Sequence, residues 1–206
     1  NYTNQGMRAL TPAEAVARKQ QPGKTYEYGV SVGGPIIANQ LHFFATIENK
    51  SLQLPNTVFP TGSSGLTIAQ AQALLPPSVA AQFGPTSNPF KETLVFAKLD
   101  WEPSENDRLE LWDLHRHETS ISGAAGQTAA SAASQVTNKN ERVNLRWQHF
   151  ADRWTNDVSL SYQNASNGSS PSSQNAQYVY NYITPTGAQQ LITVGGIGPN
   201  GVHNES

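Results

Sequence analysis

Six stretches of this chain alternate apolar and polar residues with a period of two, and this pattern limits what the chain can fold into. In the first stretch, Tyr28, Val30 and Val32 alternate with Glu27, Gly29 and Ser31. The stretches span residues 26–36, 41–49, 93–102, 108–118, 142–150 and 154–164. Because successive side chains of a β-strand point to opposite faces, the pattern predicts half-polar strands. Turn-forming residues between neighbouring stretches predict that these strands pair antiparallel in sequence order.

The predicted connections alternate between short and long. Tight turns are expected at 37–40, 103–107 and 151–153, and long loops at 49–92 and 120–141. Proline and glycine interrupt the first long loop, within which residues 66–75 could form one short helix. A third loop, rich in serine and asparagine, is expected after residue 164, and weaker strand signals follow at 177–183 and 191–194.

Short turns at one end, long loops at the other and strands with one apolar face are typical of outer-membrane barrels. The expected fold class is therefore all-β, with antiparallel transmembrane β-barrel strands in an up-and-down meander and short helices in long extracellular loops. A soluble β-sandwich also gives a period of two, and the asymmetry of the loop lengths is what favours the barrel. The small share of charged residues, 14%, suits both kinds of protein.

In a barrel, the polar positions would face a wet lumen and the apolar positions would face lipid. The candidate lumen-facing residues all carry charge: Glu27, Glu48, Lys98, Asp100, Glu102, Arg146 and Asp157. The candidate lipid-facing residues are Val30, Val32, Ile47, Val95, Leu99, Val158 and Leu160. Aromatic residues near the short turns are candidates for a membrane-interface girdle: Phe43, Trp101, Trp147 and Trp154.

The alternation changes phase within 108–118. Leu109 and Leu111 follow the apolar pattern, but Trp112 and Leu114 fall on the opposite face. A β-bulge or the rim of the barrel could cause this change, and the sequence leaves both explanations open.

The composition and motifs argue against several other function classes. The net charge of −2 gives no basic patch for nucleic acid, and the absence of cysteine removes disulfides, cysteine-bound zinc and thiol nucleophiles.

His115 and His117 could contact a metal, but without an evident third ligand we favour solvated side chains near the barrel rim. Asp100 and Glu102 could form an acid pair, but a ladder with Lys98 is favoured. No serine-hydrolase elbow or phosphate loop is present, so we expect neither an enzyme nor a bound cofactor or metal.

The domain organisation follows from these segments. Residues 1–24 are expected to be a polar lead-in with one helix-like patch at 11–18, and residues 25–206 to be early strands of an incomplete barrel. The chain begins at Asn1 without a methionine or a signal peptide, so we expect a fragment.

Several strings in these strands resemble a known family. Residues 28–36, YGVSVGGPI, followed by residues 41–48, LHFFATIE, resemble the "GGPI … FFF … E" hairpin of TonB-dependent receptors. Residues 90–103, FKETLVFAKLDWEP, look like the next hairpin, which residues 107–111 continue. Residues 153–158, RWTNDV, are similar to the family's "W.NE" strand start, with Asp157 in place of glutamate. The closest similarity is to the large Oar-like receptors, which often carry an N-terminal carboxypeptidase-regulatory-like module.

The resemblance implies a receptor in the outer membrane of a Gram-negative bacterium, with about 22 strands and a plugged lumen. Such a receptor imports a scarce nutrient with energy delivered through TonB. Its partners would be the TonB complex of the inner membrane, outer-membrane lipid and an unidentified ligand, whether siderophore, sugar or peptide. The plug domain and the TonB box would precede Asn1. Two alternatives stay open: a secreted or surface β-rich binding protein, and a passive porin-like or autotransporter barrel.

Overall fold

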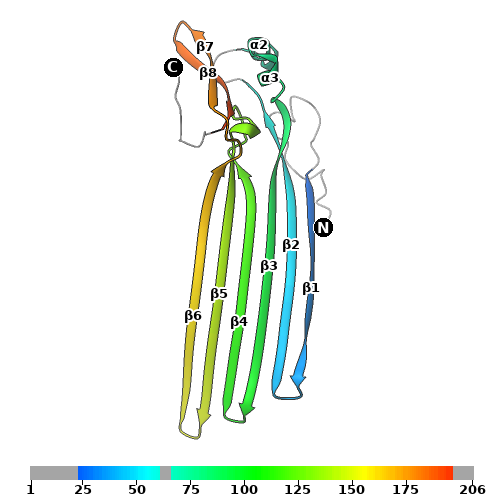
Figure 1. Cartoon of the computed structure of the whole chain (residues 1–206), viewed down its shortest axis with the longest axis vertical. Helices are drawn as coiled ribbons and strands as arrows, with labels where there is room; N and C mark the ends of the chain where they lie inside the picture. Colours follow the sequence, from blue (N-terminus) through cyan, green and yellow to red (C-terminus); the bar gives the residue numbers. More distant parts are fainter. Residues whose placement is uncertain (1–22, 61–65, 197–206) are drawn as a thin grey trace.

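The main feature of the fold is an open antiparallel sheet of six long strands (Figure 1). A computed structural model describes residues 23–60 and 66–196. The strands are β1 (Lys24–Ile37), β2 (Leu41–Val58), β3 (Gly84–Ser104), β4 (Asp107–Ser122), β5 (Ser134–Ala151) and β6 (Trp154–Pro171). They pair in the order β1-β2-β3-β4-β5-β6, which confirms the predicted up-and-down meander. The helix-like patch at 11–18, and all but the last two residues of the polar lead-in, lie outside the described residues.

Three tight turns close the hairpins β1–β2, β3–β4 and β5–β6 at one end of the sheet, the lower end in Figure 1. In the first turn Asn39 has a φ of 58°, a left-handed conformation that asparagine tolerates better than most residues. In the second, Ser104 donates a hydrogen bond to Asp107 over 2.8 Å. These turns lie within the predicted ranges 37–40, 103–107 and 151–153, so the short connections are confirmed.

The strands extend further toward the other end than the sequence predicted. The expected loops 49–92 and 120–141 are wrong at both of their margins, because β2 runs to Val58, β3 begins at Gly84, β4 runs to Ser122 and β5 begins at Ser134. The expected loop after residue 164 is also wrong, since β6 continues to Pro171. In these extensions both faces are largely polar, so no alternation marks them. Backbone hydrogen bonds of the ladder hold them instead.

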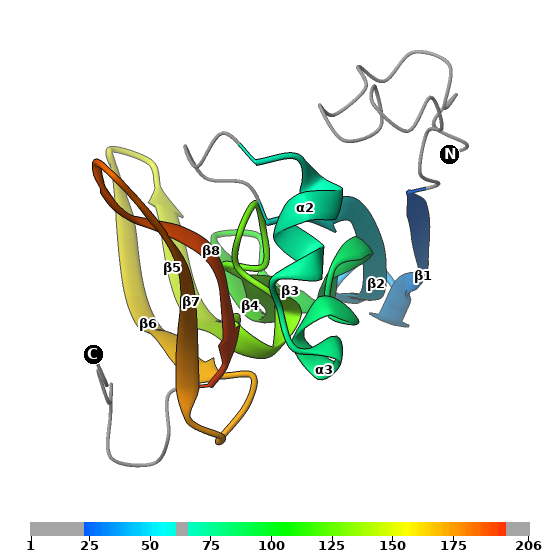
Figure 2. The ribbon, with the colours of Figure 1, turned by 90° about the horizontal axis from the view of Figure 1, so that it is seen from above.

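A small cap covers the end of the sheet opposite the tight turns (Figure 2). It contains the helices α2 (Ile68–Ala73) and α3 (Pro77–Ala80), the 3-10 turn η2 (Ala130–Ala132) and the separate hairpin β7 (Gln177–Thr184) and β8 (Gly187–Gly195). Thr67 and Gln70 form a capping box at the start of α2, where the sequence predicted one short helix. The strand signals at 177–183 and 191–194 are confirmed as β7 and β8.

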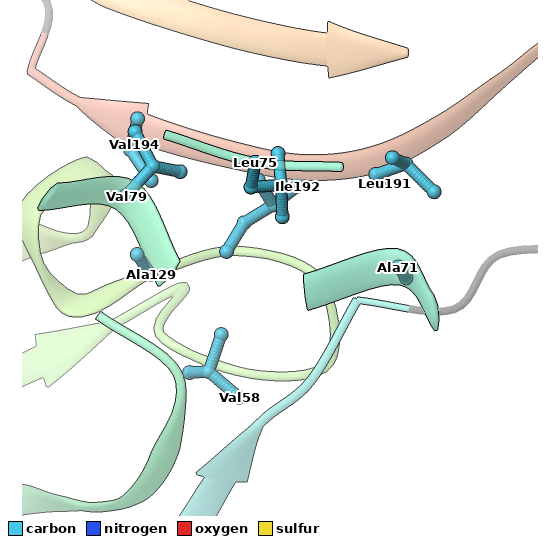
Figure 3. Close-up of a cluster of buried hydrophobic side chains, with 8 residues drawn as sticks. All are labelled: Val58, Ala71, Leu75, Val79, Ala129, Leu191, Ile192 and Val194. Carbon is cyan, nitrogen blue, oxygen red and sulfur yellow. The ribbon is translucent and has the colours of Figure 1, made fainter. Parts of the chain in front are cut away.

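The described residues bury their apolar core in this cap and not in the sheet. Its buried members come from the end of β2, from α2, α3 and the segment between them, from β8 and from the connection between β4 and β5 (Figure 3): Val58, Ala71, Leu75, Val79, Ala129, Leu191, Ile192 and Val194. Backbone hydrogen bonds from Ala129 to Thr193 and from Phe59 to Gly126, both 2.9 Å, join the connections. The described parts of the two long connections are therefore packed on each other and are not unstructured linkers.

Candidate functional site: the two faces of the sheet

The register of the sheet sorts its side chains onto two faces, because directly paired residues point to the same side. One continuous row joins five strands: Phe43, Leu99, Leu111, Leu145 and Leu160. A second row, nearer the tight turns, joins Leu41, Trp101, Leu109, Trp147 and Val158. We call this side the apolar face. All of the residues that the sequence predicted to face lipid share it.

The opposite side, which we call the charged face, holds every residue predicted to face a lumen. Two groups of ion pairs organise it. The turn-side ion cluster contains Lys98, Asp100, Glu102, Arg108 and Glu110, with Lys98 3.2 Å from Asp100 and 2.8 Å from Glu110. The cap-side ion cluster contains Glu92, Arg116 and Glu118, with Arg116 2.6 Å from Glu92.

Other predicted residues of this face lie at its margins. Arg146 donates from Nε to Asp157 over 2.9 Å, across the β5–β6 pair. Glu48 and Glu27 lie on β2 and β1, and Glu27 is paired in register with Lys50. The sequence therefore placed the charged positions on one side of the sheet and predicted the pairing of Lys98 with Asp100. It did not identify the ion pairs between strands, such as Lys98 with Glu110 and Arg146 with Asp157.

In the middle of strands β3 and β5, the charged face is the less exposed of the two. On β3, the side chains of Lys98 and Asp100 are 27% and 28% exposed, whereas Leu99 and Trp101 are 38% and 44% exposed as whole residues. On the outer strands β1 and β6, nearly all residues of both faces are exposed, among them Val30 at 67% and Leu160 at 66% on the apolar face. Water-soluble sheets place apolar side chains in the covered layer and charged ones in solvent. Here the arrangement is inverted.

The exposed apolar band crosses the strands obliquely. Its cap-side edge lies at Tyr26 on β1 and at Tyr162 on β6. In the register, Tyr162 of β6 is level with Val32 of β1, which lies six residues closer to the tight turns than Tyr26. The turn-side edge shifts in the same direction. On β2 it lies at Leu41, which is level with Val158 on β6, whereas on β6 it lies at Trp154, four residues closer to the tight turns. With a rise of about 3.3 Å per residue and strands about 4.8 Å apart, the band slopes by roughly 30–40°.

Asp107 organises the aromatic residues at the tight-turn end of the apolar face. Its carboxylate accepts hydrogen bonds from the Trp147 indole over 3.0 Å and from Ser104, and lies 2.8 Å from Nδ1 of His149. The His149 ring lies 5.1 Å from the Trp154 ring and 6.1 Å from the Trp147 ring. Hydrogen bonds from His149, Ser104 and Trp147, in that order, lower the pKa of Asp107 to about 2. The sequence indicated the tryptophans but not this carboxylate.

Phe43 and Trp101, the other predicted girdle residues, lie on the same face in its two apolar rows. Trp101 occupies the row nearer the tight turns, level with Trp147. Phe43 lies one row further from the turns, level with Leu99. The structure therefore brings Trp147 and Trp154 together around His149, and leaves Phe43 and Trp101 as separate members of the band.

The phase change in β4 has neither of the causes expected from the sequence. β4 pairs with β5 from Asp107 to Ser122 without a shift of register, so no bulge is present, and Trp112 lies well inside the strand rather than at a rim. Instead, Trp112 joins an aromatic stripe on the charged face. The stripe consists of Phe44, Phe96 and Trp112, whose neighbouring ring centres are 6.2 Å apart.

The histidines of β4 lie on the apolar face, on the cap side of the leucine row. His115 contacts Asp113 over 2.8 Å and Glu141 over 3.8 Å. Within residues 23–60 and 66–196, no group of three or more His, Asp or Glu residues is arranged to hold a metal ion. None of the described helices is both long and apolar enough to cross a membrane.

Comparisons with known proteins identify no relative. No protein-family model, no curated protein and no solved structure matches the chain. The strings that resemble TonB-dependent receptors fall on the β1–β2 hairpin, on β3, at the start of β4 and at the start of β6.

Proposed function

We propose that this chain forms part of the wall of a transmembrane β-barrel in the outer membrane of a Gram-negative bacterium. From the resemblance of its hairpins, we further propose that the barrel belongs to a TonB-dependent receptor that takes up a scarce nutrient. The observation that carries the proposal is the inverted arrangement of the two faces. An exposed surface that is largely apolar, interrupted on β4 by Asp113 and His115, extends across all six strands and needs a covering, and most of the ion pairs lie on the charged face.

Lipid accounts for this inversion without a second protein. The apolar face would contact acyl chains, and the tryptophans around Asp107 would lie at the head-group level. The slope of the apolar band also supports this, because strands of outer-membrane barrels tilt by about 35–45° from the membrane normal. If the strands tilt by this angle and the apolar band lies parallel to the membrane plane, the band slopes across the strands by about the same angle, which agrees with the slope of the band in this sheet.

The strand edges support a barrel rather than an isolated sheet. Within the described chain, β1 and β6 each have one edge without a partner strand. In hydrocarbon, an unpaired backbone edge is not tolerated, so further strands would have to close the wall. The free edge of β6 suits pairing with a further strand. Its 18 residues contain no lysine, and its one proline is the last residue, whereas edges that face water are often protected by lysines or by prolines within the strand.

The orientation follows from the two ends of the sheet. Outer-membrane barrels have short periplasmic turns, which would place the cap outside the cell. The cap would then contribute ligand contacts at the entrance of the barrel. Protease added to intact cells should cut the connections 59–83 or 123–133 and spare the turn at 105–106. Cleavage at 105–106 alone would reverse the assignment.

A fractionation experiment tests the proposal. The gene product that contains this chain is expressed in a Gram-negative host, and the inner and outer membranes are separated. We expect it in the outer membrane, with a gel mobility that changes when the sample is boiled. Recovery from the soluble secreted fraction would support a β-rich binding protein instead. Ligand uptake that persists in cells lacking TonB would contradict energy coupling and favour a passive porin-like barrel.

A further inference from the structure

The aromatic stripe is an apolar feature on the face that otherwise assembles charges. In the register, Phe44, Lys98 and Trp112 lie side by side on β2, β3 and β4, with Phe96 one row toward the cap. Phe44 is 43% exposed, and Phe96 and Trp112 are half-buried. A Cβ on Gly33 would approach Cδ2 of Phe44 to 3.1 Å, so the glycine gives the Phe44 ring room against β1.

We propose that this stripe, together with the ion clusters on either side of it, binds a neutral polyhydroxylated ligand such as an oligosaccharide. The inference rests on the proposed function, since it takes the charged face as the side along which the transported ligand passes. It adds the chemical class of that ligand and the residues that select it.

The aromatic rings of the stripe can stack against the rings of a sugar. One face of a pyranose carries C–H groups, which pack against the electron-rich face of an aromatic ring. Phe96 lies within 6.2 Å of both other rings, so the stripe offers a continuous surface across three strands. A ligand without an apolar face would leave that surface in water.

Charged side chains that can form hydrogen bonds with hydroxyl groups flank the stripe on both sides. The turn-side ion cluster borders it through Lys98, and the cap-side ion cluster lies beyond it through Arg116. Planar carboxylates and guanidinium groups can each make paired hydrogen bonds, a geometry that suits hydroxyl groups on adjacent carbons. Ion-paired side chains present these groups in fixed positions.

Further hydrogen-bonding capacity lies on β5 beside the stripe. Trp112 is level with Asn144, and Arg142 occupies the next row. The side chain of Arg142 has no hydrogen-bonding or ionic partner within the described part of the chain, and Oδ1 of Asn140 is buried without one. An open groove of about 340 Å³ continues toward the cap, lined by Arg116, Glu118, Asn138, Asn140 and Asn167 among others. These groups can receive the hydroxyls of sugar units beyond the stripe.

The charge balance of this surface favours a neutral ligand. Across the charged face of all six strands, six cationic residues stand against eight anionic ones: Lys50, Lys98, Arg108, Arg116, Arg142 and Arg146 against Glu27, Glu48, Glu92, Asp100, Glu102, Glu110, Glu118 and Asp157. Charges of both signs are interspersed and most of them are ion-paired, so the face has no field strong enough to concentrate ligands of one sign. Selection then depends on ring stacking and hydrogen bonds.

Calorimetry with the purified full-length protein tests the proposal. The probes are the linear hexasaccharides of α-1,4-glucose, β-1,4-glucose and β-1,4-N-acetylglucosamine, with hexa-aspartate and hexa-lysine peptides as charged controls. We expect at least one hexasaccharide to bind and Trp112→Ala to weaken its binding about tenfold, or about 1.4 kcal/mol. Trp112→Phe should restore most of the affinity. Phe150→Ala is the matched control, because Phe150 is an exposed aromatic residue of the same face at the tight-turn end.

Three results would overturn the proposal: no hexasaccharide binds, a charged peptide binds more tightly, or Trp112→Ala and Phe150→Ala weaken binding equally. Circular dichroism of each variant shows whether the barrel has folded. Failure of this proposal is distinct from failure of the proposed function. A protein that fractionates with the outer membrane but shows one of these results would retain its function as a barrel and lose only the ligand class.

Discussion

Replacing Leu99 with arginine should destabilise the protein strongly in lipid. Leu99 lies in the leucine row between Phe43 and Leu111, near the middle of the apolar band on β3, which runs from Val95 to Trp101. Arginine on the lipid face of a barrel costs about 2–4 kcal/mol at the bilayer midplane and much less near the interfaces. The central position of Leu99 gives the full value, which reduces the folding equilibrium constant by about 30- to 900-fold.

Ser159→Arg is the matched control. Ser159 lies on the charged face in register with Arg146, so its cost is limited to repulsion between like charges, about 1 kcal/mol or less. Both variants are unfolded from lipid vesicles with urea, and tryptophan fluorescence reports the transition. Equal costs would show that the two faces are misassigned. A Leu99→Arg variant within about 0.5 kcal/mol of the parent is the result expected for an exposed residue in water, and it would refute the account.

Three further predictions concern the ends and the edge of the sheet. The Asp107 carboxyl should titrate near pH 2 in a carbon-13 NMR experiment. Because this folded-state pKa lies below the unfolded value of about 3.9, the contribution of Asp107 to stability is present above about pH 4 and is lost as the pH falls toward 2. A titration midpoint near 4 would contradict the hydrogen bonds that Asp107 accepts from its neighbours. Gly29→Ala should destabilise the pairing of β1 with β2 by about 1–3 kcal/mol, since its Cβ would lie 2.8 Å from the Ile47 carbonyl oxygen. Gly34→Ala, whose Cβ would have nothing within 4 Å, should leave the pairing unchanged, and equal amide hydrogen exchange of β1 in both variants would refute this. Ile192→Ala, at 0% exposure, should cost the cap about 2–5 kcal/mol and increase the rate at which protease cuts it, while β3 and β4 stay protected. Loss of the whole sheet would show that cap and sheet unfold together.

The sequence predicted the sheet well where one face differs from the other. Alternation from Val95 to Trp101 specifies a strand and its orientation together, because a slip of one residue would exchange the faces. The outer halves of the same strands carry no such contrast. In β6, residues 164–170 are small or polar on both faces, and only pairing with β5 reveals them as a strand.

The candidate sites show a similar division. The face of each charged residue follows from its position in the alternation, so Lys98 and Asp157 could be placed from the sequence. The pairing of Lys98 with Asp100, on the same strand, was also predicted, whereas partners on other strands depend on the register between strands. The contacts of Arg116 with Glu92 and of Trp147 with Asp107 join residues 24 and 40 positions apart, which local patterns do not connect. Trp112 and Leu114 were visible as an anomaly, but only the unbroken register of β4 shows that they face the charged side.

Solvent accessibility along β3 tests the central claim most directly. The chain contains no cysteine, so single cysteines can carry spin labels without competing sites. Val95 and Leu99 on the apolar face are compared with Leu94 and Phe96 on the charged face, so that apolar residues are replaced in every case. In lipid, labels at 95 and 99 should collide mainly with oxygen, and labels at 94 and 96 should be the less accessible to it. Accessibility to a water-soluble nickel complex that is equal at all four positions, or greatest at 95 and 99, would contradict a lipid-facing apolar surface.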